Sequence, residues 1–357
     1  MATLPPATAA PGDDRLRRIS LTQRLLARPA AGAAIIVAFV WVVFASISIV
    51  AGTYTFVGLD GTLSYLDVAA QVGIVATSVA LLMIAGEFDL SIGSLVGFAG
   101  IVIGILVVQY GVPIWLAIII SMIATTLLGA VNGVIVVRTG LPSFIVTLAT
   151  LNIIRGMTQA ITAQITNITY IPIGRDRVAA DPVAWLFNWS SGAVLGQGVE
   201  LKVSIFWWLL IAAIGAYVLG RTRFGNWIAG VGGSATAARN LGVPVARVKV
   251  ILFAGTGLSA AILAAIQSMT FFSADVLRGR GLELTAITTA VIGGTLLTGG
   301  YGSVVGTAIG ALALGMASIG IVFANINADW YYVAIGTLLL VSVVLNNWIR
   351  RRFAGIR

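Results

Sequence analysis

The sequence predicts an all-α integral membrane protein with about ten transmembrane helices, some of them broken or reentrant. The first observation is the composition, because the 357 residues are 59% hydrophobic and only 9% charged. Soluble domains carry about 25% charged residues, so this chain cannot cover the surface of a water-soluble globule. The second observation is that the hydrophobic residues form long unbroken runs, whereas a membrane β-barrel needs short alternating strands.

Ten spans follow from the hydropathy and from the break signals between the apolar runs. The 42 glycines are spread through these runs, as expected where membrane helices pack closely. The predicted spans are 32–51, 63–85, 90–109, 113–137, 142–163, 203–220, 249–271, 285–297, 302–324 and 329–348.

The spans define a transmembrane domain at 32–348, with a tail at each end. The tail at 1–31 is rich in Pro and Ala and then basic, and the tail at 349–357 is short and basic. The longest outer loop is expected at 164–202 and the longest inner loop at 221–249. An even number of spans places both termini on the same side, and the cytoplasmic side is expected because most of the 21 Lys and Arg residues then lie inside.

The composition also excludes several kinds of chemistry. The chain has no His and no Cys, so disulfides, Cys/His metal sites and thiol or imidazole catalysis are not expected. The glycine-rich stretches at 232–236 and 293–303 lack the spacing of a phosphate-binding loop, so the chain itself should not bind ATP. The net charge of +9 is interpreted as a topology signal, and no nucleic-acid partner is expected.

Two carboxylates interrupt the apolar sequence between the second and third spans. Asp89 is suited to cap the helix that follows, because its carboxylate can accept backbone N–H bonds. Alternatively, Asp89 lines a substrate pathway together with Ser91 and Ser94. Glu87 is expected to face water, since two neighbouring buried carboxylates would repel each other.

A polar stripe crosses the fifth span and is open to two interpretations. It can join helices through hydrogen bonds, or it can line a passage for a hydroxylated solute. Its members are Thr147, Thr150, Asn152 and Arg155.

Three charged residues, Arg278, Arg280 and Glu283, fall at the predicted outer end near the eighth span. They are either solvated loop residues or a docking surface for an extracellular partner. On the inner side, a short helix is predicted at 234–241, because Gly242 follows its last residue and Pro244 comes soon after.

Four segments resemble the sugar-type ABC importer permeases, in particular the ribose/xylose/galactose permease group. The family signature Gly-x-x-Asp-Leu-Ser-x-Gly-Ser is similar to GEFDLSIGSLVG at 86–97. A second family segment, Phe-Ile-x-Thr-Leu…Arg-Gly, is similar to LPSFIVTLATLNIIRG at 141–156. The cytoplasmic coupling segment of the family resembles FGNWIAGVGGSATAARNLGVPVARVK at 224–249, and the last signature resembles AVIGGTLLTGGYGSVVGTAIGAL at 290–312.

The resemblance runs in the family's order from about residue 60 to the end of the chain. Two positions depart from the family pattern, since Glu87-Phe88 replaces Gly-Ile and Ser234-Ala235 replaces Asn-Glu. These departures bear on the identity of the substrate and on the details of ATPase docking.

The resemblance implies a transport subunit of the bacterial inner membrane and not an enzyme. It implies three protein partners in addition to the lipid bilayer: a second permease copy in a homodimer, a cytoplasmic ATPase that is either single or tandem, and an external sugar-binding protein. ATP and Mg²⁺ would bind the ATPase, and this chain would need no cofactor of its own. The residues expected to contact the ATPase are Gly233, Ala235, Ala238, Arg239 and Gly242.

The expected function is import of a monosaccharide or related polyol. Within importers, a nucleoside or an autoinducer-like sugar is the alternative substrate. An ion-coupled secondary transporter is a second alternative, although it would need an ion site of its own and intramembrane carboxylates are scarce. A membrane enzyme is a third, and the missing His and Cys weigh against it.

Overall fold

The computed structural model describes residues 30–191, 200–327 and 329–353. The predicted tail at 1–31 therefore lies almost wholly outside the described residues, and the predicted tail at 349–357 begins inside a helix. The elements in chain order are α2 (Ala30–Val50), α3 (Leu59–Ile84), α4 (Ile92–Val108), α5 (Ile114–Thr139), α6 (Ser143–Thr166), β1 (Tyr170–Pro172), α7 (Arg175–Ala180), α8 (Trp185–Asn188), α9 (Val203–Arg221), α10 (Arg223–Gly233), α11 (Ala235–Asn240), α12 (Val245–Thr270), β2 (Ser273–Asp275), α13 (Leu282–Ile292), α14 (Val304–Phe323) and α15 (Trp330–Phe353).

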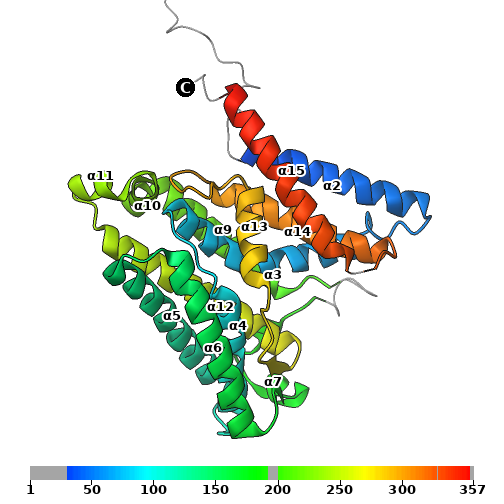
Figure 1. The fold of residues 1–357 in the computed structure, drawn as a ribbon. Helices are drawn as coiled ribbons and strands as arrows, with labels where there is room; N and C mark the ends of the chain where they lie inside the picture. The colour runs from blue at the N-terminus through cyan, green and yellow to red at the C-terminus, as the bar shows by residue number, and fades with distance from the viewer. Residues whose placement is uncertain (1–29, 192–199, 328, 354–357) are drawn as a thin grey trace, which may run out of the picture.

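Each predicted span corresponds to a helix, and the all-α membrane fold is confirmed. In the described part of the chain, eight helices are long and apolar enough to cross a membrane, and α4 and α13 are shorter apolar helices. Helix α13 ends at Ile292 and does not continue to residue 297, because the chain turns at Gly293-Gly294, where Gly294 has a φ of 87°. Helices α10 and α11 lie at the opposite end of the molecule from α7 (Figure 1).

Helices α3, α12 and α14 form the centre of the bundle, and glycines allow them to approach their neighbours closely. A Cβ on Gly257 of α12 would lie 2.4 Å from the Thr125 carbonyl oxygen of α5, and a Cβ on Gly315 of α14 would lie 2.4 Å from the Tyr65 carbonyl oxygen of α3. Side chains at these positions would push the helix backbones apart. Small residues at helix interfaces are what the glycine content predicts for a membrane bundle.

One face of α4 is made of glycines, and an extended segment lies against it. A Cβ on Gly104 would lie 2.9 Å from the Ala274 Cβ of β2, and a Cβ on Gly97 would lie 3.0 Å from the carbonyl oxygen of Arg278. At the start of the helix, a Cβ on Gly93 would lie 2.5 Å from the carbonyl oxygen of Gly279. Residues 274–279 therefore run along α4 from its last turns back to its first turn.

Strand β1 comes from the predicted outer loop and pairs antiparallel with β2. The pairing joins Tyr170 to Asp275 and Pro172 to Ser273. This two-stranded sheet covers the last turns of α4, where the Ile171 side chain lies 3.4 Å from the position of a Cβ on Gly104. The outer loop is therefore attached to the extended segment that continues toward α13.

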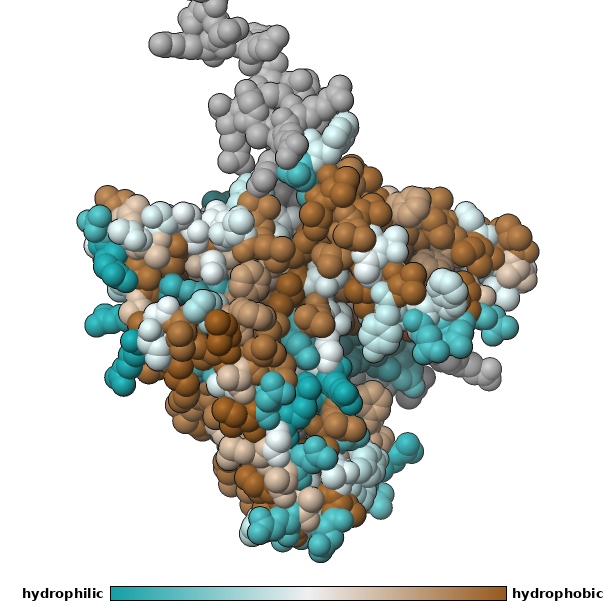
Figure 2. All heavy atoms as spheres, in the orientation of Figure 1, coloured by the Kyte–Doolittle hydropathy of each residue, from teal (hydrophilic) through white to brown (hydrophobic). Residues whose placement is uncertain are grey.

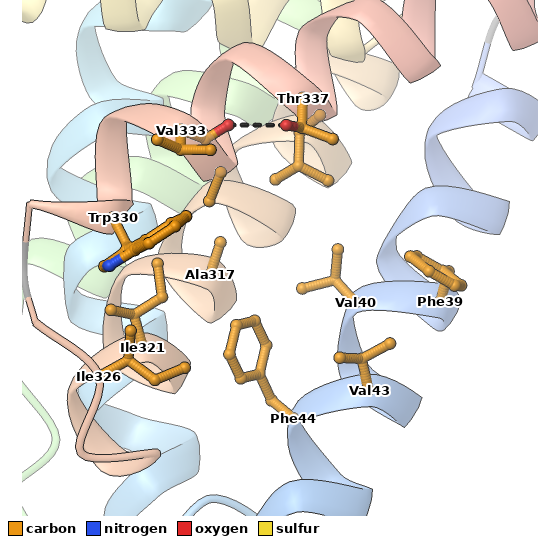
Figure 3. Close-up of a pocket in the computed structure, with 12 residues that line it drawn as sticks. Phe39, Val40, Val43, Phe44, Ala317, Ile321, Ile326, Trp330, Val333 and Thr337 are labelled. Atoms are coloured by element: carbon orange, nitrogen blue, oxygen red, sulfur yellow. Dashed lines mark hydrogen bonds between the residues drawn. The ribbon is translucent and has the colours of Figure 1, made fainter.

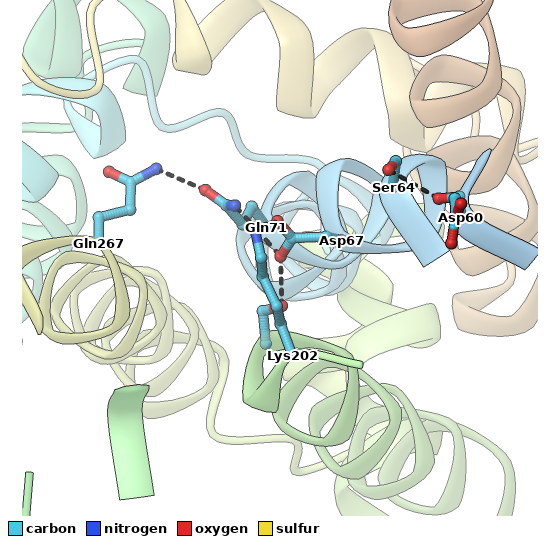
Figure 4. Close-up of polar contacts among 7 residues, drawn as sticks. Asp60, Ser64, Asp67, Gln71, Lys202 and Gln267 are labelled. Atoms are coloured by element: carbon cyan, nitrogen blue, oxygen red, sulfur yellow. Dashed lines mark hydrogen bonds and ion pairs between the residues drawn. The ribbon is translucent and has the colours of Figure 1, made fainter. Parts of the chain in front are cut away.

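A chain of polar contacts joins α3 to α9 and α12 (Figure 4). Asp67 of α3 accepts hydrogen bonds from Lys202 at 3.0 Å, from Ser204 at 2.5 Å and from Gln71 at 3.3 Å. Gln267 of α12 donates to the Gln71 side chain at 3.0 Å. Each of these contacts satisfies a polar group that would be costly if it were buried alone in a membrane bundle.

Helices α2 and α15 lie side by side at the edge of the bundle (Figure 1). An apolar pocket opens between them and α14, lined by Val40, Phe44, Ile321, Trp330 and other apolar side chains (Figure 3). Phe44 and Val40 from the second half of α2 face residues from the first half of α15. The two helices are therefore antiparallel, and the beginning of α2 and the end of α15 lie at the same side of the bundle.

Candidate functional site

The break between α3 and α4 at 85–91 holds a fully buried carboxylate, that of Asp89. Its Oδ1 accepts hydrogen bonds from the Ser91 backbone N–H at 2.9 Å and from the Ser91 hydroxyl at 2.6 Å. Its Oδ2 accepts a bond from Thr256 of α12 at 2.6 Å, and Asn132 of α5 donates to the Ser91 hydroxyl at 2.9 Å. Asp89 accepts a backbone N–H before the helix, as expected, but the prediction that it caps a helix starting near Leu90 is wrong, because α4 begins at Ile92 and Ser91 is its N-cap residue. The same carboxylate also ties the break to α12 directly and, through Ser91, to α5.

Glu87 is also buried, with 8% of its surface exposed, and the expectation that it faces water is wrong. Its Oε1 forms an ion pair with the ammonium group of Lys249. The sequence places Lys249 at the end of the inner loop, whereas it lies within the first two turns of α12. Because the ammonium group compensates the charge of Glu87, two carboxylates two residues apart are both buried without net repulsion.

Three glycine-bearing motifs that are far apart in the sequence meet beside this break. A Cβ on Gly232 of α10 would lie 1.8 Å from the carbonyl oxygen of Ile84 and 2.5 Å from the Gly300 nitrogen. Gly299 has a φ of 78°, and a Cβ there would lie 2.8 Å from the Cα of Gly86. The Gly300 N–H donates to the Ile84 carbonyl at 2.8 Å. The end of α3, the end of α10 and the turn before α14 are therefore in backbone contact.

The remaining pathway candidates differ in exposure. Ser94 and Thr147 are buried, Thr150 is half-buried and Asn152 is exposed. Each of the four donates a hydrogen bond to a carbonyl oxygen in its own helix or, for Ser94, just before it. The structure thus joins Asp89 and Ser91 in one network and leaves Asn152 on an open helix face. Whether these residues line a pathway stays a prediction.

From Asn152 onward, one exposed face of α6 carries polar and small side chains, and the sequence revealed it only in part. Asn152, Gly156, Gln159 and Ala163 follow one another at intervals of four, three and four residues and are all exposed. Arg155 lies beside them and is partly exposed. Such intervals place side chains on one face of a helix. The sequence signal for Gln159 was this spacing, counted forward from Asn152.

The three charged residues predicted at the outer rim have three different environments. Arg278 donates to the Ser273 carbonyl at 2.5 Å, and its guanidinium group lies 5.2 Å from the centre of the Phe271 ring. Arg280 is exposed. Glu283 is not a rim residue, since it is only 9% exposed and pairs with an arginine of α6. Of these three residues, Arg280 alone is exposed.

The inner segment contains the predicted short helix as α11, Ala235–Asn240. The hydroxyl of Ser234 accepts the backbone N–H of Ala237 at 3.2 Å and caps it, and Gly242 has the expected positive φ of 83°. Gly233, Arg239 and Gly242 are exposed, and Ala235 is half-buried.

Ala238 is 4% exposed and belongs to the buried hydrophobic cluster that contains Val231 and Val248. Its side chain therefore faces the bundle and is not available to a partner. Leu241, which the sequence analysis did not single out, is 85% exposed at the end of α11. An exposed leucine beside a buried alanine was not detectable from a short segment with no clear periodicity.

Polar partners that lie far apart in the sequence were also missed. Asp67, Asn132, Lys249 and Thr256 all bind buried polar groups, and none has a local motif that marks it. Among the described residues, no three His, Cys, Asp or Glu side chains lie close enough together to hold a metal ion.

Comparison with protein families matches residues 61–343 to the branched-chain amino acid transport system / permease component family. The chain belongs to this family. The matched region contains the buried break, the glycine junction and the α10–α11 segment described above. The resemblance of the four motifs to sugar-type ABC importer permeases is confirmed by the relatives of the chain.

The chain is 30% identical to the ribose import permease protein of Haemophilus influenzae, over 82% of this chain and 87% of that protein. It is 32% identical to the xylose transport system permease protein of Escherichia coli K12, over 79% and 84%. It is 30% identical to the fructose import permease protein of Rhizobium meliloti, over 80% and 77%. No solved structure matches the chain.

Proposed function

We propose that this chain is the transmembrane subunit of an ABC importer that moves a monosaccharide or related polyol from an external binding protein into the cytoplasm. The observation that supports this function best is the exposed polar face of α6. A spanning helix that turns Asn152 and Gln159 toward lipid would carry a large free-energy cost. The face is therefore assigned to a water-filled passage or to a contact with a second copy of the chain.

The side chains on this face favour a neutral solute. Amide groups such as those of Asn152 and Gln159 both donate and accept hydrogen bonds, as hydroxyl groups do. The relatives named for ribose, xylose and fructose have neutral hydroxylated solutes, which supports the same class. A nucleoside or an autoinducer-like sugar also carries ribose-like hydroxyl groups and is the alternative within this class.

Energy for transport is assigned to a separate cytoplasmic ATPase, which would hold ATP and Mg²⁺. The docking segment on this chain is α11 with its flanking residues. Arg239 and Leu241 are exposed there, while Ala238 anchors the helix to the bundle. Helix α10 contacts the break before Asp89 through Gly232, so movement of the docking segment would reach the break directly.

The same proposal fixes the orientation. With α10 and α11 in the cytoplasm, the antiparallel pair α2 and α15 and the ten successive helices place both ends of the chain on that side. The strand pair β1–β2 then lies on the external side, where Arg280 is available to the binding protein.

An uptake assay tests the function. The chain is expressed with the ATPase and binding-protein genes that adjoin its own gene, and uptake of radiolabelled ribose, xylose, fructose, adenosine and leucine is measured. We expect uptake of at least one of the three sugars, and loss of that uptake when the ATPase is omitted. Uptake of leucine or adenosine alone, or uptake without an ATPase, would contradict the proposal.

Because the chain contains no Cys, single cysteines can map the passage. We expect N152C, G156C and Q159C to react with a membrane-impermeant, water-soluble thiol reagent. The reason is that a cysteine thiol must be in contact with water to ionise to the reactive thiolate. The matched controls are I153C, M157C and I161C, which are exposed on the apolar side of the same helix. Equal labelling of both sets would show that this face of α6 does not line the passage.

A further inference from the structure

The described residues contain three ion pairs between side chains, and one of them differs from the other two. Lys202 lies 3.0 Å from Asp67, which also accepts bonds from Ser204 and Gln71. Lys249 and Glu87 are in direct hydrogen-bonding contact. The pair between Arg155 of α6 and Glu283 of α13 is open by comparison, with 3.6 Å between the nearest nitrogen and oxygen.

Both partners of this pair have a buried atom without a hydrogen bond. Within the described part of the chain, neither the Arg155 Nη2 nor the Glu283 Oε2 has a hydrogen-bond partner. Glu283 is only 9% exposed, so its carboxylate has little contact with bulk water. Buried charged groups in native proteins nearly always have their bonds made, and an exception calls for an explanation.

The pair lies where two short helices begin. Glu283 is in the first turn of α13, and its Oε2 lies only 2.0 Å from the position that a Cβ on Gly93, in the first turn of α4, would occupy. Short helices whose N-termini meet inside a membrane bundle are a recurrent form of substrate site in transporters. The glycine at residue 93 leaves the carboxylate room against the α4 backbone.

Polar residues flank the pair along the chain. Asn152 and Gln159 lie three residues before and four residues after Arg155 on α6 and are exposed, and exposed Arg280 lies three residues before Glu283. Figure 2 shows hydrophilic residues gathered near the middle of this face, beside α6 and below α13, with hydrophobic surface around them. The polar neighbours of Arg155 therefore offer hydrogen bonds to a solute beside the pair.

The Arg155 Nη2 and the Glu283 Oε2, which have no hydrogen-bond partner within the described residues, indicate the chemistry of the ligand. A guanidinium nitrogen can only donate and a carboxylate oxygen can only accept, so a ligand that satisfies both must present an acceptor beside a donor. Two adjacent hydroxyl groups do so. An anionic group would be repelled by Glu283, and an apolar group would leave both polar atoms without a hydrogen bond.

We propose that Arg155 and Glu283 form the point at which the permease binds adjacent hydroxyl groups of its solute, one hydroxyl accepting from Arg155 and the other donating to Glu283. The inference rests on the proposed function and names the residues that recognise the solute. Both free atoms are shielded in the conformation described here, while 27% of the Arg155 side chain is exposed. Binding therefore requires α6 and α13 to separate, and the open ion pair lowers the cost of that separation.

The test uses the full chain in lipid nanodiscs. Binding of D-ribose, D-xylose and D-fructose is measured by saturation-transfer NMR for the parent chain and for R155Q and E283Q. We expect at least one sugar to bind the parent and to bind each variant about ten-fold more weakly, which is the change expected for loss of one charge-assisted hydrogen bond of about 1.4 kcal/mol.

The matched control is D67N, which alters a buried ion pair whose carboxylate is fully hydrogen-bonded. It is expected to lower the thermal unfolding midpoint without changing sugar affinity. Single-deoxy derivatives of the bound sugar supply a readout that a purely structural role would not affect. The parent should prefer the sugar over at least one derivative, because an unmatched buried polar group penalises the analogue, and E283Q should lose that preference.

Two results would overturn the inference. If folded R155Q and E283Q bind sugar with the affinity of the parent, the pair is not part of the binding site. In that case, sugar uptake by the complete transporter would show that the proposed function still holds. Absence of binding for all three sugars in the parent would also overturn it. If the uptake assay fails for the same sugars as well, the proposed function itself is wrong.

Discussion

The central pair of helices, α3 and α12, differs from the peripheral pair, α2 and α15, in a way that hydrophobicity does not explain. Helix α2 has the most hydrophobic span of the eight in the described residues, yet only 28% of its span is buried, against 78% for α3 and 6% for α15. In a soluble protein the more hydrophobic helix would lie deeper. In a bilayer, lipid tails solvate apolar side chains as well as other helices do, so apolar character does not select the interior.

Polar groups and glycines distinguish the central pair. Ser78 of α3 and Ser259 of α12 share a hydrogen bond of 2.6 Å, and the Gln71–Gln267 and Asp89–Thr256 contacts lie along the same interface or at its end. The pocket between α2, α14 and α15 is lined almost entirely by apolar side chains. Groups that lipid cannot satisfy are thus gathered at the centre, and groups that lipid can satisfy are left at the edge.

The largest effect is expected at the buried carboxylate that closes the central region. Asp89→Leu removes the acceptor of three hydrogen bonds and should destabilise the chain by about 3 kcal/mol or more and abolish uptake. Asp89→Asn keeps an acceptor and should be much milder. Thermal unfolding in detergent and uptake in vesicles measure the two effects. A stable, active Asp89→Leu would show that the network has no structural role.

A pair of equivalent truncations tests the comparison directly. Leu263 of α12 is fully buried and Leu340 of α15 is 69% exposed. Leu263→Ala should cost about 2 kcal/mol, because the cavity term remains even where the transfer term is small. Leu340→Ala should cost less than about 0.5 kcal/mol. Similar losses of unfolding free energy in detergent would mean that α15 is packed as tightly as α12.

The glycine junction offers a test within one helix. Gly232→Ala places a methyl group against the Ile84 carbonyl and should cost about 1.5 kcal/mol and slow transport. Gly230→Ala in the same helix meets no atom within 4 Å and should be neutral or slightly stabilising. The unfolding midpoint and uptake rate of both variants are measured together. If both variants have the same unfolding midpoint and the same uptake rate, the contact between α10 and the break has no role in transport.

The smallest effect on stability is expected at the docking segment. Arg239→Glu and Leu241→Ser change exposed side chains and should alter the unfolding free energy by less than about 0.5 kcal/mol. Both should reduce co-purification of the ATPase and solute-stimulated ATP hydrolysis. Ala238→Leu, by contrast, should destabilise the chain itself, because Ala238 faces the bundle. Normal co-purification with both surface variants would place the ATPase elsewhere.

The fold class, the ten helices and the short inner helix could be predicted from the sequence because hydropathy, capping and helix-stop signals are local. Each is encoded within some twenty neighbouring residues, and insertion into a bilayer depends on that local apolar character. The local hydrogen bond of Asp89 was predictable for the same reason, since its carboxylate accepts the N–H of Ser91 two positions away, although the N-cap residue of α4 is Ser91 and not Asp89. The four motifs were sufficient to indicate the family.

The tertiary structure alone decided which polar residues meet. Glu87 and Lys249 are 162 residues apart, and the sequence assigned one to water and the other to a loop. The sequence predicts Glu283 as a rim charge, whereas it pairs with Arg155 of α6. The sequence also predicts Ala238 as a docking residue, whereas the packing of α11 places its side chain against the bundle. Lipid leaves apolar surfaces without a preferred partner, so the arrangement of these helices depends on a few close glycine contacts and buried hydrogen bonds whose two halves lie in distant segments.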